Sequence, residues 1–317
     1  MNKAKLQEHL QLFAQDQEEI HVEMYLQYKD EKDNILTYLP AAEEKKLSPA
    51  LGQIVRKQIK NKFFLENDDY QYEVVSAHSA EANDIRQVFH VSKSEIPKAE
   101  IIFDAVANNK AVEFPKNAEL KDVWAYIFKV ECSVGTIYLW KKNYQVSVLR
   151  KENGYALFFS NNKLSLLDKD LLRLSQHFDV MLVSNELIIL SRSEFEKAFD
   201  YVGAMQAAAE TNIGVIKKSK LIETDSLEKI SELAQNKRTL RKLLNINPNS
   251  KILKKTPVQI AKLAKKYKVT LDVSEDKSRL AISSKRAAEA FVGLLNDDYL
   301  KSEFSDSLYK IKGKSQI

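Results

Sequence analysis

The segment DVMLVSNELIILS, residues 179–191, is the feature that most restricts how this chain can fold. Its two arms are almost continuous apolar runs, and the polar pair Ser184-Asn185 between them predicts the turn of a β-hairpin. Strands without a polar face are typical of positions inside a sheet that is covered on both sides. We therefore expect a central hairpin that is buried on both of its faces.

The residues before this hairpin carry a mixture of strand and helix patterns. Apolar alternation and β-branched or aromatic enrichment predict strands at residues 20–28, 35–39, 70–77, 123–132, 136–143, 147–151 and 155–160. Helices are predicted at residues 3–18, 48–65, 84–89 and 97–107. In the helix at 48–65, Ser48 would be the N-cap and Pro49 the first helical residue.

The pattern changes to a helical period at Ser193. Apolar side chains then recur on one helix face, namely Phe195, Phe199, Val202 and Met205 or Gln206. Further helices are predicted at residues 227–244, from Thr256 onward and at 286–295, with a hairpin at 268–283. The sequence thus predicts an α+β fold, with a sheet-containing domain at residues 1–192 that has a strand-rich middle and a mostly helical basic domain at 193–317.

Charge is distributed unevenly between the two ends of the chain. The formal net charge is +5, yet residues 206–317 carry 23 basic and 13 acidic residues, a net charge of +10. Residues 1–205 carry 26 basic and 31 acidic residues, a net charge of −5. Such asymmetry indicates an anionic partner for the basic part, either nucleic acid or another anionic surface.

The basic stretch, residues 236–268, contains eleven Lys or Arg residues and neither Asp nor Glu. Solvated faces normally mix both signs, because like charges repel and opposite charges relieve that repulsion. A helix at 227–244 would place leucines on one face and four cations on the neighbouring face. In the next helix, Thr256 is placed to be the N-cap, Pro257 the first residue and Gln259 the capping-box partner, with an apolar stripe from Val258, Ala261 or Ile260, Ala264 and Tyr267.

Phosphate is the counterpart that this basic stretch favours. Lys and Arg contacts to phosphates release counterions and need no base recognition, so the resulting binding tolerates any sequence. We predict non-catalytic binding of double-stranded DNA through ten phosphate-contacting cations, namely Lys237, Arg238, Arg241, Lys242, Lys251, Lys254, Lys255, Lys262, Lys265 and Lys266.

Other interpretations of the same stretch remain open. Lysines can simply make helices soluble, and an acidic protein surface could replace DNA as the partner. An anionic lipid surface fits less well, because the helices lack a Trp- and Phe-rich apolar face. The segment TPVQIAKLAKKYKVT also resembles the first helix of a helix-turn-helix, but residues 271–282 favour a hairpin over a recognition helix.

Catalytic motifs are missing from the sequence. There is no phosphate-binding Gly-rich loop and no GxSxG, and the five histidines (His9, His21, His78, His90 and His177) have no metal-ligand spacing. We predict no catalytic residue, metal or cofactor, with His177 at the end of a short helix and Cys132 as a buried, inert thiol. A metal-dependent nuclease is the enzymatic alternative, on the strength of Glu275-Asp276-Lys277 with Asp272 upstream.

The sequence also predicts a cytoplasmic location. A single cysteine cannot form an intramolecular disulfide, which fits a reducing compartment. The N-terminal residues MNKAKLQEHLQLF lack the apolar core of a signal peptide. The longest uncharged runs reach about half of the roughly 20 residues that a membrane helix needs.

Two segments of the second half carry a family resemblance. They are FSNNKLSLLDKDLLRLSQHFDVMLVSNELIILSRSEFEKAFDY, residues 159–201, and FVGLLNDDYLKSEFSDSLYKIKGK, residues 291–314. Together with the basic helices between them, they resemble the KwaB family of the Kiwa anti-phage defence system over roughly residues 120–314. The chain departs from the family at Phe304-Ser305-Asp306, where the family tends to have a Leu-Thr-Gly step.

The resemblance implies a DNA-binding effector that interferes with phage replication and late transcription. It also implies a small membrane partner of the KwaA type, which could recruit the protein to the inner face of the membrane, and self-association into a homo-oligomer. It transfers no active-site residue to this chain.

Overall fold

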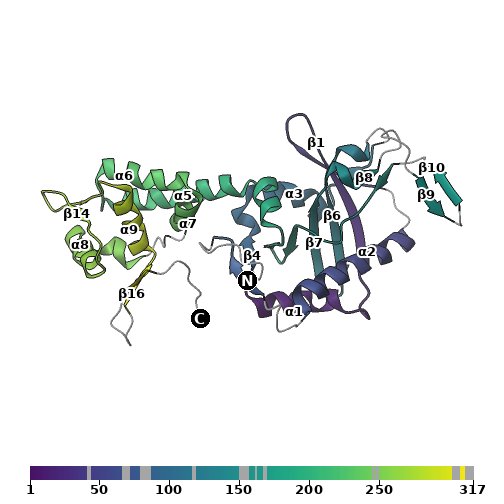
Figure 1. Cartoon of the computed structure of the whole chain (residues 1–317), viewed down its shortest axis with the longest axis horizontal. Coiled ribbons are helices and arrows are strands. Elements are labelled where there is room, and N and C mark those ends of the chain that lie inside the picture. The colour runs from purple at the N-terminus through teal and green to yellow at the C-terminus, as the bar shows by residue number, and fades with distance from the viewer. Residues whose placement is uncertain are drawn as a thin grey trace. The chain divides into compact units, whose positions relative to one another are not determined.

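The computed structural model covers the whole chain and describes residues 1–40, 44–65, 72–78, 87–115, 119–149, 157–160, 163–166, 170–244, 246, 250–301 and 308–310. The chain forms two compact units, Met1–Ser76 with Ile85–Asp200 and Ala77–Asp84 with Tyr201–Ile317 (Figure 1). The predicted domains, 1–192 and 193–317, stay a prediction, because compactness alone does not show that a part folds independently.

The first unit is built on a nine-stranded sheet with the order β3-β4-β13-β12-β7-β6-β1-β2-β5. Its pairs are antiparallel except for β3 with β4 and β2 with β5. The strands are β1 (His21–Lys29), β2 (Ile35–Leu39), β3 (Glu73–Ser76), β4 (Gln87–Ser92), β5 (Val112–Glu113), β6 (Val123–Cys132), β7 (Gly135–Lys142), β12 (Val180–Val183) and β13 (Glu186–Ile189).

The predicted central hairpin is confirmed. Ser184 and Asn185 have φ values of 47° and 68°, and positive φ at both central residues is what a two-residue type I′ turn requires. Its arms are β12 and β13, which lie inside the sheet between β7 and β4. All four residues of β12 are buried, as expected of a strand covered on both sides.

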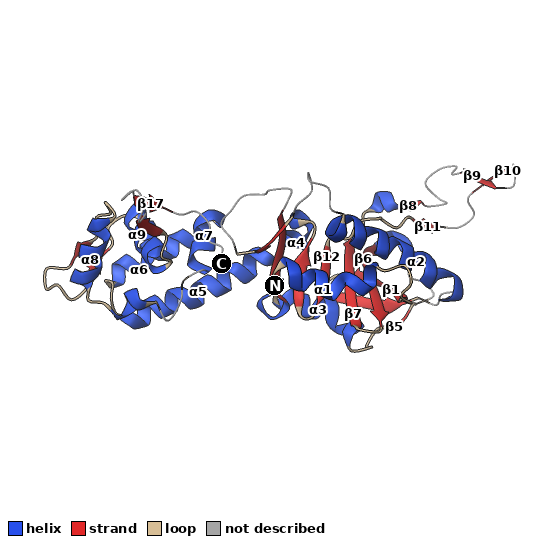
Figure 2. Cartoon of the chain, turned by 90° about the horizontal axis from the view of Figure 1, so that it is seen from below, coloured by secondary structure: helices blue, strands red, loops and turns tan. Residues whose placement is uncertain are grey.

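Helices cover both faces of this sheet, which makes three layers (Figures 1 and 2). On one face, α1 (Lys3–Ala14) and α2 (Glu44–Ile59) pack with alternate residues of β6 such as Phe128 in a single core cluster. On the other face lie α3 (Pro97–Ala107) and α4 (Arg192–Ala198). There the ring of Phe199 lies 5.1 Å from that of Trp140 and 6.1 Å from that of Phe103.

A buried amide joins four elements of the first unit. Gln27 in β1 is fully buried, and its Nε2 donates to Thr37 Oγ1 at 3.1 Å and to the Ile102 carbonyl at 2.8 Å. Its Oε1 accepts from the indole N–H of Trp140 at 3.1 Å. Since all three polar partners are satisfied in a dry environment, this side chain fixes β1, β2, β7 and α3 relative to one another.

The predicted start of α2 is wrong. The helix already includes Glu44, so Ser48 and Pro49 lie inside it and not at its start. The Ser48 hydroxyl accepts from the Val22 backbone N–H at 2.9 Å and therefore joins the helix to β1. Pro49 is therefore an interior residue of the helix, where it lacks the backbone N–H that would donate the usual i→i−4 hydrogen bond.

The helix predicted at residues 84–89 is also wrong for residues 87–89, which form part of a strand. Gln87 begins strand β4, which pairs with β3 on one side and β13 on the other. Pairing on both edges outweighs the weak local helix pattern, since strand preference depends on neighbours more than on sequence. Residues 84–86 lie outside the described residues.

Most other elements of the first unit lie near their predicted positions. The helix predicted at 97–107 matches α3, and the strands at 20–28, 35–39, 123–132 and 136–143 match β1, β2, β6 and β7 within two residues. The first helix ends at Ala14, not residue 18. Of the other predicted strands, the described residues contain shorter parts, namely β3, β8 (Val148–Leu149) and β9 (Leu157–Ser160). Strand β8 pairs with β11 (Leu171–Leu172), and β9 pairs with β10 (Lys163–Leu166).

The second unit is mostly helical, as predicted (Figure 2). Its helices are α5 (Tyr201–Ser219), α6 (Thr224–Ser231), α7 (Lys237–Leu244), α8 (Pro257–Lys266) and α9 (Lys285–Leu295). Two short hairpins accompany them, β14 (Asp272–Val273) with β15 (Leu280–Ala281) and β16 (Tyr299–Lys301) with β17 (Leu308–Lys310). The hairpin predicted at 268–283 and the helix predicted at 286–295 are thereby confirmed.

The single helix predicted at 227–244 is wrong, because the chain breaks at Asn236. Helix α6 passes into a 3₁₀ turn, Glu232–Gln235, and Asn236 is extended with φ −111° and ψ 125° before α7 begins. The Thr239 hydroxyl donates to the carbonyls of Leu233 and Asn236, and the Asn236 carbonyl also accepts from the Leu240 backbone N–H at 2.8 Å. Met205, not Gln206, is buried on α5, while Phe195 and Phe199 are buried in the first unit.

Candidate nucleic-acid interface

Helix α9 is the scaffold on which the basic stretch is held. Residues 290–295 of this helix are all buried, and α7 and the 3₁₀ turn Lys251–Lys254 both pack against it. The side-chain amide of Asn296 donates to the Lys242 carbonyl at 2.7 Å. The Ser250 hydroxyl donates to the Leu295 carbonyl at 3.4 Å. The carboxyl end of α9 therefore fixes both α7 and the following turn.

Helix α8 has the predicted capping box. Thr256 Oγ1 accepts from the Gln259 backbone N–H at 3.3 Å, and Gln259 Oε1 accepts from the Thr256 N–H at 3.0 Å. Ile260 and Ala264 supply the buried face, whereas Val258, which the predicted stripe included, is 47% exposed. This arrangement leaves the lysines of α8 on the solvent side of the helix.

Seven lysines of the basic stretch are exposed. None of the seven forms an ion pair with another residue that the structure describes, so their charges are uncompensated within this part of the chain. They are Lys251, Lys254, Lys255, Lys262, Lys265, Lys266 and Lys268. The first six are among the ten predicted phosphate contacts, and we refer to all seven as the lysine array.

The four predicted cations of α7 are placed differently. Arg241 and Lys242 are half-buried, and Lys242 Nζ lies 3.4 Å from Asp298 Oδ2, with side chains that are only 15% and 13% exposed. The side chains of Lys237 and Arg238 lie outside the part of the chain that the structure describes. For Lys242, the contact with Asp298 compensates part of the charge that a phosphate would otherwise meet.

A groove of about 1030 Å³ lies beside the lysine array. It runs between the end of α8 and the start of α9, and Tyr267, Lys268, Ser284, Arg286 and Tyr299 are among its lining residues. The two tyrosine rings are 5.7 Å apart, and burial raises the pKa of Tyr299. Two cations, Lys268 and Arg286, line this groove together with two carboxylates, Asp272 and Glu289, so the charges of its lining are balanced.

Sequence reasoning missed Arg286 as part of this site. The predicted hairpin at residues 268–283 contained the signal, because the second strand of a hairpin ends beside the start of the first strand. Val273 pairs with Leu280 and Asp272 with Ala281, so residues that follow the hairpin lie beside the end of α8. Arg286 is exposed on the first turn of α9, after the N-cap Ser284.

Asp276, the centre of the proposed nuclease triplet, shapes a turn. Its carboxylate accepts from the hydroxyls of Ser274 and Ser278, at 2.5 and 2.6 Å, and from the Ser278 backbone N–H at 3.0 Å. These hydrogen bonds lower the pKa of this exposed carboxyl to about 2. No group of three or more His, Cys, Asp or Glu residues in the described ranges is arranged to hold a metal ion.

The structure also shows where two of the histidines and the single cysteine lie. His177 lies in the irregular segment between β11 and β12 and not at the end of a helix, so that prediction is wrong. Cys132, at the end of β6, is partly buried against the core cluster. His90 Nδ1 lies 2.9 Å from Glu186 Oε2, across the pair β4 and β13.

Within the described residues, the structure contains no helix with the length and apolarity needed to cross a membrane. The longest helix of the second unit, α5, has 19 residues and carries Glu210, Lys217 and Lys218.

Comparisons with known proteins identify the family. A family model described as Kiwa protein KwaB-like matches residues 120–305, which include the central strands of the sheet and the whole basic stretch. A protein of Escherichia coli O55:H7 (strain RM12579 / EPEC), named Kiwa protein KwaB, is 25% identical over 222 residues, or 66% of this chain and 70% of that protein. No solved structure matches.

The chain is therefore a Kiwa protein, and the coarse function that this supports is a part in anti-phage defence. More narrowly, it belongs to the family of Kiwa KwaB-like proteins, as the sequence resemblance indicated.

Proposed function

We propose that this Kiwa KwaB-like protein binds double-stranded DNA non-catalytically and without sequence preference, through its basic stretch. The observation that carries the proposal is the lysine array, in which seven exposed cations have no ion-pair partner among the described residues. An exposed array of one sign creates a positive field that attracts anionic partners. A polyanion that neutralises it would gain affinity from released counterions.

The groove between α8 and α9 extends this proposed interface. Lys268 and Arg286 line it, so the cations of the lysine array continue into this concave surface, where they lie beside Asp272 and Glu289. Phosphates on such a surface would fix the position of the duplex without selecting a base sequence. Arg286 thereby joins the ten cations that the sequence singled out.

The cellular setting is part of the same proposal. The protein acts in the cytoplasm as a homo-oligomer, and a small KwaA-like membrane partner recruits it to the inner face of the membrane. Family membership supports this setting, because a KwaB-like protein is one component of the Kiwa system.

Anisotropy of a labelled 30-bp duplex, measured against protein concentration at two salt levels, tests the DNA proposal. Between about 50 and 200 mM salt, several phosphate contacts should weaken binding on the order of 10³-fold. The informative variant is Lys254→Glu/Lys255→Glu/Lys265→Glu/Lys266→Glu, whose four positions are all exposed. We expect at least about a 100-fold weaker affinity and a flatter salt dependence.

The matched control is Lys217→Glu/Lys218→Glu, an exposed lysine pair on α5 in the same unit but outside the basic stretch. It should change affinity much less. A folded quadruple variant with wild-type affinity would refute the assignment of these lysines. Absence of duplex binding at low salt would refute DNA as the partner and leave an acidic protein surface to be tested.

A further inference from the structure

The groove between α8 and α9 contains two aromatic rings that contacts with phosphates alone do not require. The rings of Tyr267 and Tyr299 lie 5.7 Å apart with an angle of 35° between their planes, and both line the groove. A duplex presents its phosphates on the outside and keeps the faces of its bases inside the stack. Stacking on a tyrosine needs a base with an exposed ring face, as in a single strand. The tyrosine pair therefore suits unpaired nucleotides better than the duplex itself.

The way in which α8 ends fixes the position of Tyr267. The helix ends with a Schellman motif, in which the Lys268 N–H donates to the Lys265 carbonyl at 3.1 Å. The second bond of this motif runs from the Val269 N–H to the Ala264 carbonyl and also measures 3.1 Å. Tyr267 is the C-cap residue between these bonds. The backbone that carries its ring is thus ordered before any ligand binds, which lowers the entropic cost of binding.

Helix α9 fixes the second ring of the pair. A Cβ atom at Gly293 would lie 3.1 Å from Cε2 of Tyr299, so the missing side chain at this position lets the ring lie close to the helix. Tyr299 is itself partly buried. The two tyrosines are therefore held from different helices and form one aromatic surface in the groove.

The charged groups of the groove suit a single strand better than the phosphates of a duplex. Lys268 and Arg286 can contact phosphates, whereas Asp272 and Glu289 repel them. Carboxylates accept hydrogen bonds from the N–H groups of base edges, and unpairing exposes those that a base pair otherwise uses. A strand that brings phosphates together with unpaired base edges therefore matches both signs of the lining.

The groove begins where the lysine array ends. Lys265, Lys266 and Lys268 are exposed members of the array on both sides of Tyr267 in the sequence. A strand that leaves a duplex bound to the array can therefore continue into the groove. The volume of about 1030 Å³ is at the upper end of the roughly 300–1,000 Å³ of small-molecule sites, which gives room for a short run of nucleotides.

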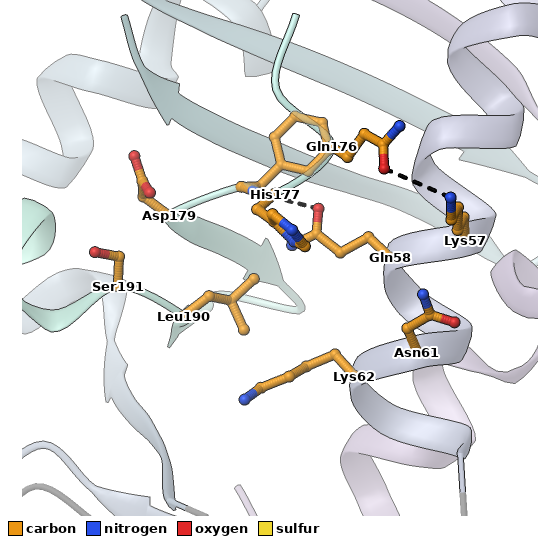
Figure 3. A pocket seen from close by; sticks show the side chains of 10 residues that line it. Lys57, Gln58, Asn61, Lys62, Gln176, His177, Asp179, Leu190 and Ser191 are labelled. Atoms are coloured by element: carbon orange, nitrogen blue, oxygen red, sulfur yellow. Dashed lines mark hydrogen bonds between the residues drawn. The ribbon is translucent and has the colours of Figure 1, made fainter. Parts of the chain in front are cut away.

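The cavity of the first unit differs from this groove in its chemistry (Figure 3). It has a volume of about 340 Å³ and lies between the end of α2 and the segment that leads into β12. Lys57 Nζ donates to Gln176 Oε1 at 3.5 Å, and Gln58 Oε1 accepts from the Phe178 N–H at 2.9 Å, so polar groups bond across it. Neither tyrosine nor tryptophan is among the described residues that line it. It therefore supplies a control position outside the groove.

We propose that the groove between α8 and α9 binds a short stretch of single-stranded DNA beside a bound duplex, so that DNA with unpaired ends is the preferred form. A base of this stretch stacks on Tyr267, and Lys268 and Arg286 contact its phosphates. Asp272 and Glu289 accept hydrogen bonds from base edges. This inference rests on the proposed DNA binding and names the form of DNA that binds most tightly.

Anisotropy measurements with matched 30-bp duplexes test the proposal. One duplex is blunt, others carry a four-nucleotide overhang at a 5′ or a 3′ end, and a third kind carries the same overhang made of abasic nucleotides. An abasic overhang keeps the phosphates and lacks the bases. We expect a normal overhang to raise affinity about tenfold over the blunt duplex, because of base stacking, and the abasic overhang to raise it much less.

Variants of the groove should change the advantage of the overhang and not the binding of the blunt duplex. Tyr267→Leu removes the ring and should abolish the advantage, whereas Tyr267→Phe keeps the ring and should retain it. Lys268→Gly removes a cation without backbone strain, because Lys268 has a φ of 58°, which glycine adopts readily. It should reduce the advantage in part. Tyr144→Leu, at an exposed tyrosine of the first unit, and Lys57→Ala are the controls and should leave it unchanged.

The possible outcomes separate this inference from the proposed function. Equal affinity for blunt and overhung duplexes, or an abasic overhang as effective as a normal one, would overturn the inference and leave duplex binding in place. An advantage that a folded Tyr267→Leu variant retains would overturn it as well. Failure of every duplex to bind at low salt would overturn both. The quadruple lysine variant of the basic stretch should weaken blunt and overhung duplexes alike.

Discussion

The two units treat their charged side chains in opposite ways. In the first unit, lysines at many positions contact carboxylates, as in Lys29 with Asp33, Lys93 with Glu100 and Lys129 with Glu23 and Glu131. In the second unit, the seven lysines of the lysine array make no such contact with a described residue. These lysines of the first unit are thus compensated within the chain, while the lysine array leaves one sign available to another molecule.

Unpaired lysines in the array affect the stability of the second unit little but affect its association with other molecules strongly. A surface ion pair contributes little to folding, about 0–1 kcal/mol, so the missing pairs of the lysine array are a small loss for the second unit. Their absence matters for association, because a field of one sign attracts a polyanion over several ångströms. The three predictions below alter one side of this contrast at a time.

The largest effect is expected from the buried polar network of the first unit. Gln27→Leu keeps the approximate volume but leaves the Trp140 indole N–H and the Ile102 carbonyl without their partner. We expect a loss of about 3 kcal/mol in the free energy of unfolding, measured with urea. Thr37→Val removes a single contact of the network and should cost less. Equal stability of Gln27→Leu and wild type would contradict this account.

A smaller effect is expected when a carboxylate is introduced next to a lysine of the lysine array. Val258 is exposed and lies four residues before Lys262 on α8, so Val258→Glu creates an i,i+4 ion pair of the kind found in the first unit. Stability should rise by about 0.3 kcal/mol, and duplex affinity should fall about tenfold because one carboxylate enters the array. Val258→Gln, which adds no charge, should leave affinity unchanged; equal losses in both variants would contradict the charge explanation.

An effect confined to alkaline pH concerns a lysine that is half-buried in the first unit. Burial lowers the pKa of Lys142 from 10.5 to about 8, and its Nζ donates to the Trp124 carbonyl at 2.8 Å. Between pH 8 and 10 the unfolded chain keeps a proton that the folded chain has lost, so the free energy of unfolding should rise with pH there. Lys142→Met should remove this part of the slope in urea titrations. An unchanged slope in that variant would show that Lys142 is not the group responsible.

Much of the first unit could be predicted because its signals are local. The apolar arms around Ser184-Asn185 specify both a turn and a buried position, and the structure has both. Pro97 begins a helix where a proline is favoured. The start of α2 and the strand at Gln87 could not be predicted, since each depends on a partner distant in sequence, Val22 for Ser48 and β13 for β4.

The candidate site was predicted in composition and not in geometry. Eleven cations without a carboxylate are visible in the sequence, and so is the capping box of α8. The break at Asn236 and the pairing of Lys242 with Asp298 are not, because both depend on how α7 packs against α9.

The order of strands in the sheet has a consequence for how the chain can be divided. The family match begins at residue 120, so it includes β6, β7, β12 and β13, which are neighbours in the middle of the sheet. Strands β1 and β4 come from residues before 120, and they pair with the outer edges of β6 and β13. A fragment that starts at residue 120 would present both of these apolar strands as open edges, which pair readily with other chains. The N-terminal residues therefore shield the family's own strands from aggregation.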